Sequence, residues 1–162
     1  MPNSPAVITL SGLPLADLAR LRRAYRATDY QIHSRPPIVL RVGGPVAGLA
    51  DWLATGGCDT ALVITAFNPF SRPTPATENL QQQEALQTAV RASGLSHVAA
   101  EGVGRDGAWP PEPSLCVFDA PAPLVDTWLI AFSQAAVVVA DAQGCRLVWH
   151  PGLRAGLPPD PP

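Results

Sequence analysis

The stretch TALVITAFNPFSRPTPATEN, residues 60–79, decides the fold because it joins an apolar segment to a turn and then to a helix. Residues 60–66 lack the alternation of a half-exposed strand, so they predict a strand covered on both faces of its sheet. After the turn NPFSR, Thr74 is expected to cap a helix with Pro75 as its first residue and Gly94 at its end. A strand, a crossover helix and a return to the sheet are therefore expected.

The same alternation continues along the chain and favours an α/β fold. Helices are predicted over residues 14–26, 45–55, 75–93 and 123–133, and strands over residues 36–42, 60–66, 96–104, 113–119, 135–141 and 145–150. The fourth strand follows the third without a helix, so we expect a mixed sheet of about six strands with crossover helices packed on it. Residues 11–150 form this single domain, after an irregular lead-in over 1–10 and before a Pro-rich tail over 151–162 that is expected to be disordered.

Composition limits the class of protein. Of the 162 residues, 47% are hydrophobic and 15% charged, which is typical of a globular domain. The formal charge of −2 gives no reason to expect a nucleic-acid partner, and no apolar run is long enough to span a membrane. Three cysteines without a C-x-x-C pair, and an N-terminus without a signal peptide, indicate the cytoplasm. The sequence carries no signal for an oligomeric state.

Strand directions collect polar residues at one edge of the predicted sheet. If residues 36–42 run upward, the helical connections make the second and third strands run upward too, and the fourth runs downward. Open α/β sheets bind ligands at the carboxyl edge of such strands. The candidate ligand-binding residues at this edge are Arg41, Asn68, Ser71, Arg72, Trp109, Ser114 and Gln134. Asn79 and Gln83 join them because they share a helix face with apolar residues and should be buried.

Glu112 is the candidate catalytic residue. Prolines on both sides stiffen its loop, so its carboxylate is suited to act as a general base or as a hydrogen-bond acceptor. Trp109 would shield it and raise its pKa, whereas Arg41 or Arg72 would lower that pKa. Arg41 lies in an apolar strand and needs a partner, which Glu112 or a bound anion supplies. A surface glutamate in a Pro-rich loop is the alternative.

The remaining motifs give weaker evidence for a functional site. RVGGPVAG, residues 41–48, can present amide N–H groups to an anion, but it lacks the P-loop residues and a plain strand-to-helix turn is favoured. The three histidines, His33, His97 and His150, show no metal-ligand spacing, so no metal site is predicted. No G-x-S-x-G elbow and no cofactor motif are present. The arginines of residues 20–26 are interpreted as a solvated helix face.

Four runs carry a family resemblance: ITAFNPFS, ENLQQQEAL, GVGRDGAWPPEPSLCVF and FSQAAVVVA. They resemble an uncharacterised bacterial group, domain-of-unknown-function family 3293, over roughly residues 25–148. The residues that match the family are Tyr25, Asn68, Ser71, Asn79, Glu112, Ser114 and Gln134. The resemblance implies no established activity, substrate or cofactor.

Two functions stay open. The first is a polar site at the sheet edge for a small molecule that carries an anionic or amide group. The second is a protein-interaction module without chemistry, in which the same residues only brace loops. A polar cleft would favour the first, and side-chain amides bonded to backbone beside an apolar patch would favour the second.

Overall fold

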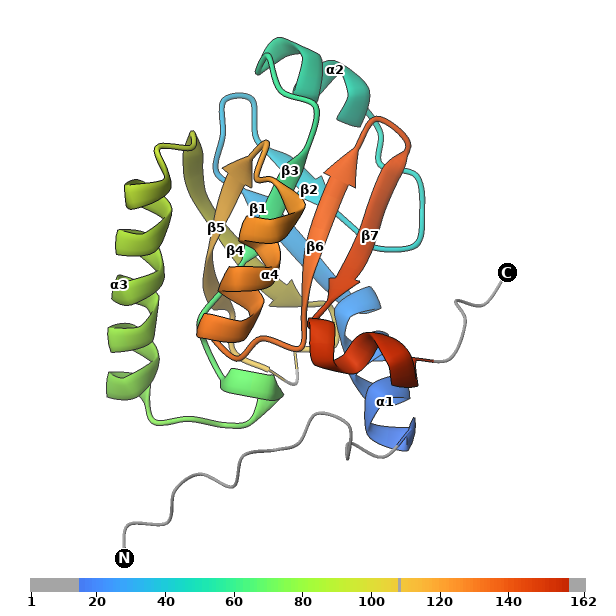
Figure 1. Cartoon of the computed structure of the whole chain (residues 1–162). Helices are drawn as coiled ribbons and strands as arrows, with labels where there is room; N and C mark the ends of the chain where they lie inside the picture. Colours follow the sequence, from blue (N-terminus) through green and yellow to red (C-terminus); the bar gives the residue numbers. More distant parts are fainter. Residues whose placement is uncertain (1–14, 108, 158–162) are drawn as a thin grey trace, which may run out of the picture.

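The computed structural model describes residues 15–107 and 109–157, so the predicted lead-in and residues 158–162 of the predicted tail lie outside the described residues. Its α-helices are α1 (Leu15–Arg26), α2 (Leu49–Thr55), α3 (Ala76–Ser93) and α4 (Ala122–Ala131). Its strands are β1 (Thr28–Ile32), β2 (Ile38–Leu40), β3 (Ala61–Ile64), β4 (His97–Gly104), β5 (Glu112–Phe118), β6 (Ala136–Asp141) and β7 (Gly144–Trp149). Two short 3-10 helices, η2 (Pro69–Ser71) and η3 (Pro151–Gly156), complete the described part (Figure 1).

The strands form one sheet in the order β2-β1-β4-β5-β3-β6-β7. The α/β class and the single domain are confirmed, but every pairing is antiparallel, so the sheet is not mixed. The six predicted strands do run in the predicted directions. Strands of the same direction never become neighbours, because each crossover helix passes over one strand and because β1, which was not predicted, lies between β2 and β4.

The central elements β3-α3-β4-β5-α4-β6 form two interleaved β-α-β units. Helix α3 joins β3 to β4 across β5, and helix α4 joins β5 to β6 across β3. This order of elements and strands is the split β-α-β arrangement called ferredoxin-like. It makes β3 a central strand that pairs with β5 on one side and with β6 on the other.

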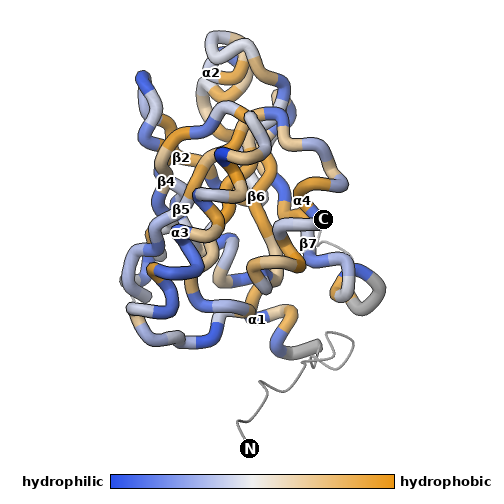
Figure 2. Tube along the Cα trace, turned by 60° about the vertical axis from the view of Figure 1, so that its left-hand side comes forward, coloured by the Kyte–Doolittle hydropathy of each residue, from blue (hydrophilic) through white to orange (hydrophobic). Residues whose placement is uncertain are grey.

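Strand β3 is buried on both faces, as its sequence predicts. Leu62 and Ile64 pack in the core beneath α3 and α4, whereas Ala61 and Val63 pack on the opposite face with Leu49 of α2. Figure 2 shows the hydrophobic stretches in the strands, for example along β6. A third cluster joins α1 and η3 to the start of β6 and the end of β7.

Several local expectations need correction. Helix α2 begins at Leu49, after Gly48 in the left-handed conformation, and not at Pro45. Thr74 does not cap α3, because its hydroxyl donates to the carbonyl of Arg72. Residues 151–156 form η3 rather than a disordered tail, because Leu153 is buried against α1. The end of α3 at Gly94, with φ 73°, is as predicted.

Among the helices of the described part, none combines the length and the apolar character needed to cross a membrane.

Shortening a leucine on the inner face of α3 should destabilise the fold. Leu86 is 0% exposed and Leu80, on the same helix, is 55% exposed. Leu86→Ala is expected to lower the free energy of unfolding by about 2–5 kcal/mol, because it leaves a cavity. Leu80→Ala, the matched control, should change it by less than about 0.5 kcal/mol. Urea denaturation measures both, and equal midpoints would contradict the assigned helix face.

Candidate functional site

Three segments meet at one end of the sheet, which we call the loop edge: residues 65–75 after β3, residues 109–114 around the start of β5, and residues 132–135 before β6. The Asn68 side chain donates from Nδ2 to Oε1 of Glu112 over 2.8 Å. Nε2 of Gln134 donates to the carbonyl of Phe67 over 3.2 Å, and the Phe70 amide to the carbonyl of Ser133 over 2.8 Å. The predicted contact among these segments is therefore confirmed (Figure 1, lower end of the sheet).

The backbone of the loop edge is strained. Asn68, Phe70 and Ser71 have φ of 47°, 50° and 58°, and Ser133 beside them has φ of 50°. Asparagine tolerates this left-handed region, but a bulky residue such as Phe70 rarely adopts it. Among the described residues, Asp119 is the one other non-glycine residue with positive φ. Strained residues cluster at functional sites, where the surrounding structure holds them in place.

Two asparagines hold the strained loop through reciprocal hydrogen bonds. Oδ1 of Asn79 accepts from the Asn68 amide over 2.9 Å, and its Nδ2 donates to Oδ1 of Asn68 over 3.0 Å. The Thr74 amide also donates to Oδ1 of Asn68, and Nδ2 of Asn79 donates to the Thr74 carbonyl. Asn79 is 5% exposed, so its predicted burial is confirmed.

The amides of Gln83 and Gln134 also serve the loop. Oε1 of Gln83 accepts from the Ala66 amide over 2.9 Å, although this side chain is only half-buried. Gln134 is buried and donates to the carbonyls of Phe67 and Phe132. Like Asn79, these two residues brace the loop by hydrogen bonds from their side-chain amides to its backbone.

Glu112 is held by two donors on one oxygen. Its Oε1 accepts from Asn68 and also from Nε1 of Trp109, each over 2.8 Å. Among the described residues, no donor reaches the other oxygen, Oε2. Trp109 is 39% exposed, so an aromatic face stands open beside the carboxylate. Ser114, by contrast, is buried and its hydroxyl donates to the Glu112 carbonyl.

The arginine expected beside Glu112 lies elsewhere. Arg41 donates to both oxygens of Asp29, over 2.8 and 3.2 Å, and Arg105 donates to the same carboxylate over 2.8 Å. The predicted pairing of Arg41 with Glu112 is wrong, because β1 and β4 separate β2 from β5. The hydrogen bond from Arg41 is the main cause that lowers the pKa of Asp29. Ser71 and Arg72, in contrast, are exposed on the loop.

Two tyrosines lie beneath Glu112. The Tyr25 hydroxyl accepts from the Ala136 amide over 3.2 Å and lies 3.3 Å from its carbonyl, and the Tyr30 hydroxyl donates to the Tyr25 carbonyl over 3.5 Å. Burial raises the pKa of both phenols, and the negative charge of Glu112 adds to the increase. Both phenols are therefore neutral at physiological pH. Tyr30 was missed because its strand, β1, was not recognised.

His150 ends the last predicted strand at this edge, as the strand directions implied, but it was not among the predicted ligand-binding residues. Its ring lies 5.8 Å from the Phe70 ring, and its Nδ1 accepts from the Gly152 amide over 2.9 Å. The neutral ring therefore carries its proton on Nε2. Burial lowers the pKa of His150, and Arg154 lowers it further, whereas Asp126 opposes the shift. Metal-ligand spacing could not reveal a histidine that packs against a loop.

Metal ligands are dispersed over the described part of the chain. No group of three or more His, Cys, Asp or Glu side chains there could hold a metal ion. The loop edge accordingly offers one carboxylate, the Arg72 guanidinium, hydroxyls, amides and aromatic rings as its chemical groups.

One protein family matches the part of the chain that contains the loop edge. Residues 64–137 match the family described as "Protein of unknown function (DUF3293)". The predicted resemblance is confirmed over this range, which contains Asn68, Asn79, Glu112 and Gln134 but not Tyr25. No curated protein and no solved structure matches the chain. The DUF3293 match therefore covers the three segments that meet at the loop edge, and its description names no activity.

Replacing Asn79 tests how the loop is held. Asn79→Leu keeps a similar volume but leaves the Asn68 amide and the Oδ1 of Asn68 with fewer partners. The free energy of unfolding is expected to fall by about 1–3 kcal/mol. Gln82→Leu, an exposed amide on the same helix, is the control and should change it by less than about 0.5 kcal/mol. Equal denaturation midpoints would show that Asn79 does not hold the loop.

The lowered pKa of His150 gives a pH dependence with a definite sign. Below the ordinary value of about 6.5, the unfolded chain binds a proton that the folded protein does not. The stability contributed by neutral His150 is therefore present above about pH 6.5 and is lost as the pH falls through the lower folded pKa. In His150→Asn, whose Oδ1 can still accept from Gly152, the free energy of unfolding should fall less between about pH 7 and pH 5. Identical slopes in urea denaturation would contradict this assignment.

Proposed function

We propose that the loop edge binds a small molecule through a carboxamide or related N–H group, with Glu112 as its acceptor. The observation that carries this proposal is that the two oxygens of the Glu112 carboxylate differ in their hydrogen bonds. Oε1 is fixed by Asn68 and Trp109, whereas Oε2 has no donor among the described residues. A carboxylate held by two charge-assisted hydrogen bonds offers its second oxygen in a defined direction.

The neighbouring groups fit an amide better than an anion. Among the described residues, no basic side chain bonds to Glu112, and the Arg41 expected there is bound to Asp29. A ligand carboxylate would meet this charge unfavourably. The exposed Ser71 hydroxyl and Arg72 guanidinium can instead donate to the carbonyl of a carboxamide whose N–H groups face Glu112. The strained loop supports the same proposal, since strain of this kind is typical of binding sites.

In the same arrangement Glu112 is the candidate catalytic residue, as a general base for a proton carried by the ligand. We propose the cytoplasm of a bacterium as the setting. The three cysteines, Cys58, Cys116 and Cys145, are free thiols, which suits a reducing compartment.

A protein-interaction module is the second candidate. It is favoured by the bracing roles of Asn79, Gln83 and Gln134, and by two exposed apolar side chains on the helical face, Leu80 on α3 and Ile130 on α4. In this alternative the loop edge would be rigid but would hold no small molecule.

Matched ligand pairs test the first proposal. Thermal unfolding is measured with nicotinamide, asparagine and glutamine, and with the corresponding acids nicotinate, aspartate and glutamate. A carboxamide is expected to raise the melting temperature, whereas its acid should not, because the acid has a carboxylate in place of the amide N–H group and this carboxylate repels Glu112. Stabilisation by the acids alone would contradict the amide proposal. No shift with any member of the panel would favour the interaction module.

Glu112→Gln then tests the residue itself. The glutamine oxygen can accept from Asn68 and Trp109, so the free energy of unfolding should change by less than about 1 kcal/mol. Its NH₂ group would replace Oε2, so carboxamide binding should weaken by at least about tenfold. Glu84→Gln, an exposed glutamate on α3, is the control and should bind as the parent protein does. Unchanged binding by Glu112→Gln would remove Glu112 from the site.

A further inference from the structure

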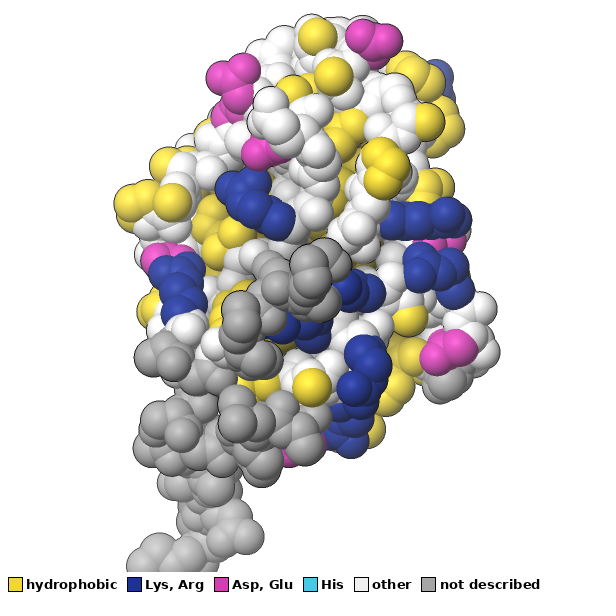
Figure 3. Space-filling model, turned by 90° about the vertical axis from the view of Figure 1, so that its right-hand side faces the viewer, with side chains coloured by type: hydrophobic (Ala, Val, Ile, Leu, Met, Phe, Trp, Pro, Cys, Tyr) yellow, Lys and Arg dark blue, Asp and Glu magenta, His cyan; other side chains and the backbone are white. Residues whose placement is uncertain are grey.

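The four tryptophans of the chain differ in what covers their rings. Trp128 is 3% exposed in the core, and the Trp52 ring packs 5.6 Å from another aromatic ring. Figure 3 shows arginine side chains gathered over the face that carries α1 and β7, and the guanidinium carbon of Arg22 lies 5.8 Å from the centre of the Trp149 ring. Trp109, in contrast, is 39% exposed, and no arginine or aromatic ring of the described residues packs on it. Tryptophans are enriched at binding surfaces, where one part of the side chain is apolar and the other part forms a hydrogen bond.

The Trp109 ring has a fixed orientation beside Glu112. Its Nε1 donates to Oε1 over 2.8 Å, and an indole N–H lies in the plane of its ring, so the edge of the ring faces the carboxylate. Pro110 and Pro111 follow directly, and their fixed φ limits the conformations of the loop. A ring that is held before binding loses little entropy when a ligand packs on it.

A second aromatic ring lies on the same face of the sheet as Glu112. The register of β1, β4 and β5 places Tyr30, Gly102 and Glu112 directly beside one another, and residues opposite each other on antiparallel strands share a face. A Cβ added to Gly102 would lie 3.8 Å from Cε1 of the Tyr30 ring, so this ring packs over the glycine that separates it from Glu112. The sheet beside the carboxylate is therefore aromatic, and it suits an apolar ring better than a second charged group.

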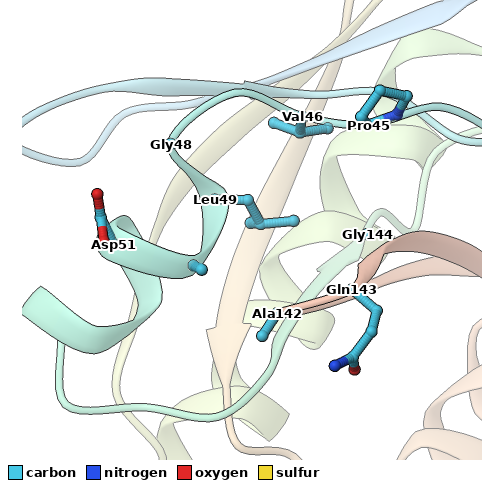
Figure 4. A pocket seen from close by; sticks show the side chains of 9 residues that line it. Pro45, Val46, Gly48, Leu49, Asp51, Ala142, Gln143 and Gly144 are labelled. Atoms are coloured by element: carbon cyan, nitrogen blue, oxygen red, sulfur yellow. The ribbon is translucent and has the colours of Figure 1, made fainter.

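Two open hollows of about 270 and 390 Å³ lie away from the loop edge, between residues 43–51 and the turn that joins β6 to β7. Figure 4 shows the side chains of Val46 and Leu49 facing this turn. The walls include the carboxylates of Asp51 and Asp141, but no described aromatic ring lines either hollow. A carboxamide bound there would therefore show no preference for an aromatic ring.

We propose that the loop edge selects a carboxamide attached to a flat aromatic ring, with Trp109 as the residue that determines this specificity. This specificity rests on the proposed carboxamide site, whose class of ligand it narrows. With the amide N–H on Oε2 of Glu112 and the indole N–H on Oε1, the ligand ring and the Trp109 ring are neighbours on one carboxylate. Two such rings stack with an offset or meet edge to face at centroid separations of about 4.5–7 Å, which favours an aromatic over a saturated ring.

Benzamide and cyclohexanecarboxamide are the matched probes, because they carry the same carboxamide on rings of nearly equal size. The full chain is titrated with each, and the chemical shifts of the tryptophan indole N–H groups are followed. Benzamide is expected to bind at least about threefold more tightly and to move the Trp109 signal, while the signal of the buried Trp128 stays in place. Equal dissociation constants would overturn the specificity and leave the carboxamide site standing. Binding of benzoate alone, binding that leaves the Trp109 signal unmoved, or no binding of either amide would overturn both.

Two substitutions of Trp109 separate the ring contact from the hydrogen bond to Glu112. Trp109→Leu removes both, whereas Trp109→Phe removes the N–H donor and keeps an aromatic face. Loss of the donor affects both amides alike, so the ratio of their dissociation constants isolates the ring contact. The preference for benzamide should persist in Trp109→Phe and fall below about 1.5-fold in Trp109→Leu. A preference that survives in Trp109→Leu, or that is lost equally in both variants, would overturn the role of the Trp109 ring. If Trp109→Leu does not fold, the titration of the parent protein still decides.

Discussion

The reciprocal hydrogen bonds between Asn68 and Asn79 are the interaction on which the loop edge depends. Residues such as Phe70 and Ser71 are held at positive φ, and each strained residue costs on the order of 1–3 kcal/mol. A buried asparagine from α3 offsets this by satisfying both the backbone and the side chain of Asn68. Asn68 can then direct its own Nδ2 to Glu112. The orientation of the Glu112 carboxylate thus depends on the contact between the loop after β3 and helix α3.

Antiparallel pairing explains why distant segments converge here. In this sheet β3 and β7 end at the edge where β5 and β6 begin, so polar residues before and after strands become neighbours in space. The interleaved crossover helices place β3 in the middle, and its following loop therefore contacts both the start of β5 and the approach to β6. A site assembled in this way requires the whole central unit to be folded.

Local patterns predicted those features that depend on local geometry. Helical spacing placed Asn79 on the inner face of α3, and strand directions brought Asn68 and Glu112 to one edge. The order of strands could not be read in this way, because it is set by pairing between residues far apart in the sequence. For the same reason the predicted partner of Arg41 was wrong. Its partner Asp29 lies in strand β1, which the alternation of TDYQI indicates only weakly.

Backbone strain could not be predicted from the sequence either. NPFSR is a recognisable turn, but nothing in it marks Phe70 as left-handed, and Ser133 carries no local signal of any kind. The strand directions brought His150 to this edge, but its packing against the Phe70 ring was not predicted. Strain and long-range packing together decide which side chains of the loop edge are exposed, and both are consequences of tertiary structure.

The central position of β3 has a consequence for the synthesis of this chain on the ribosome. Its partners are β5 and β6, both of which come later in the sequence, and among the described residues no earlier strand pairs with it. The apolar residues of β3 therefore stay without both partner strands until the ribosome has synthesised residues 136–141. Exposed strands of this kind are prone to aggregate in a nascent chain. The amount of soluble protein obtained should accordingly depend on how quickly translation proceeds from α3 to β6.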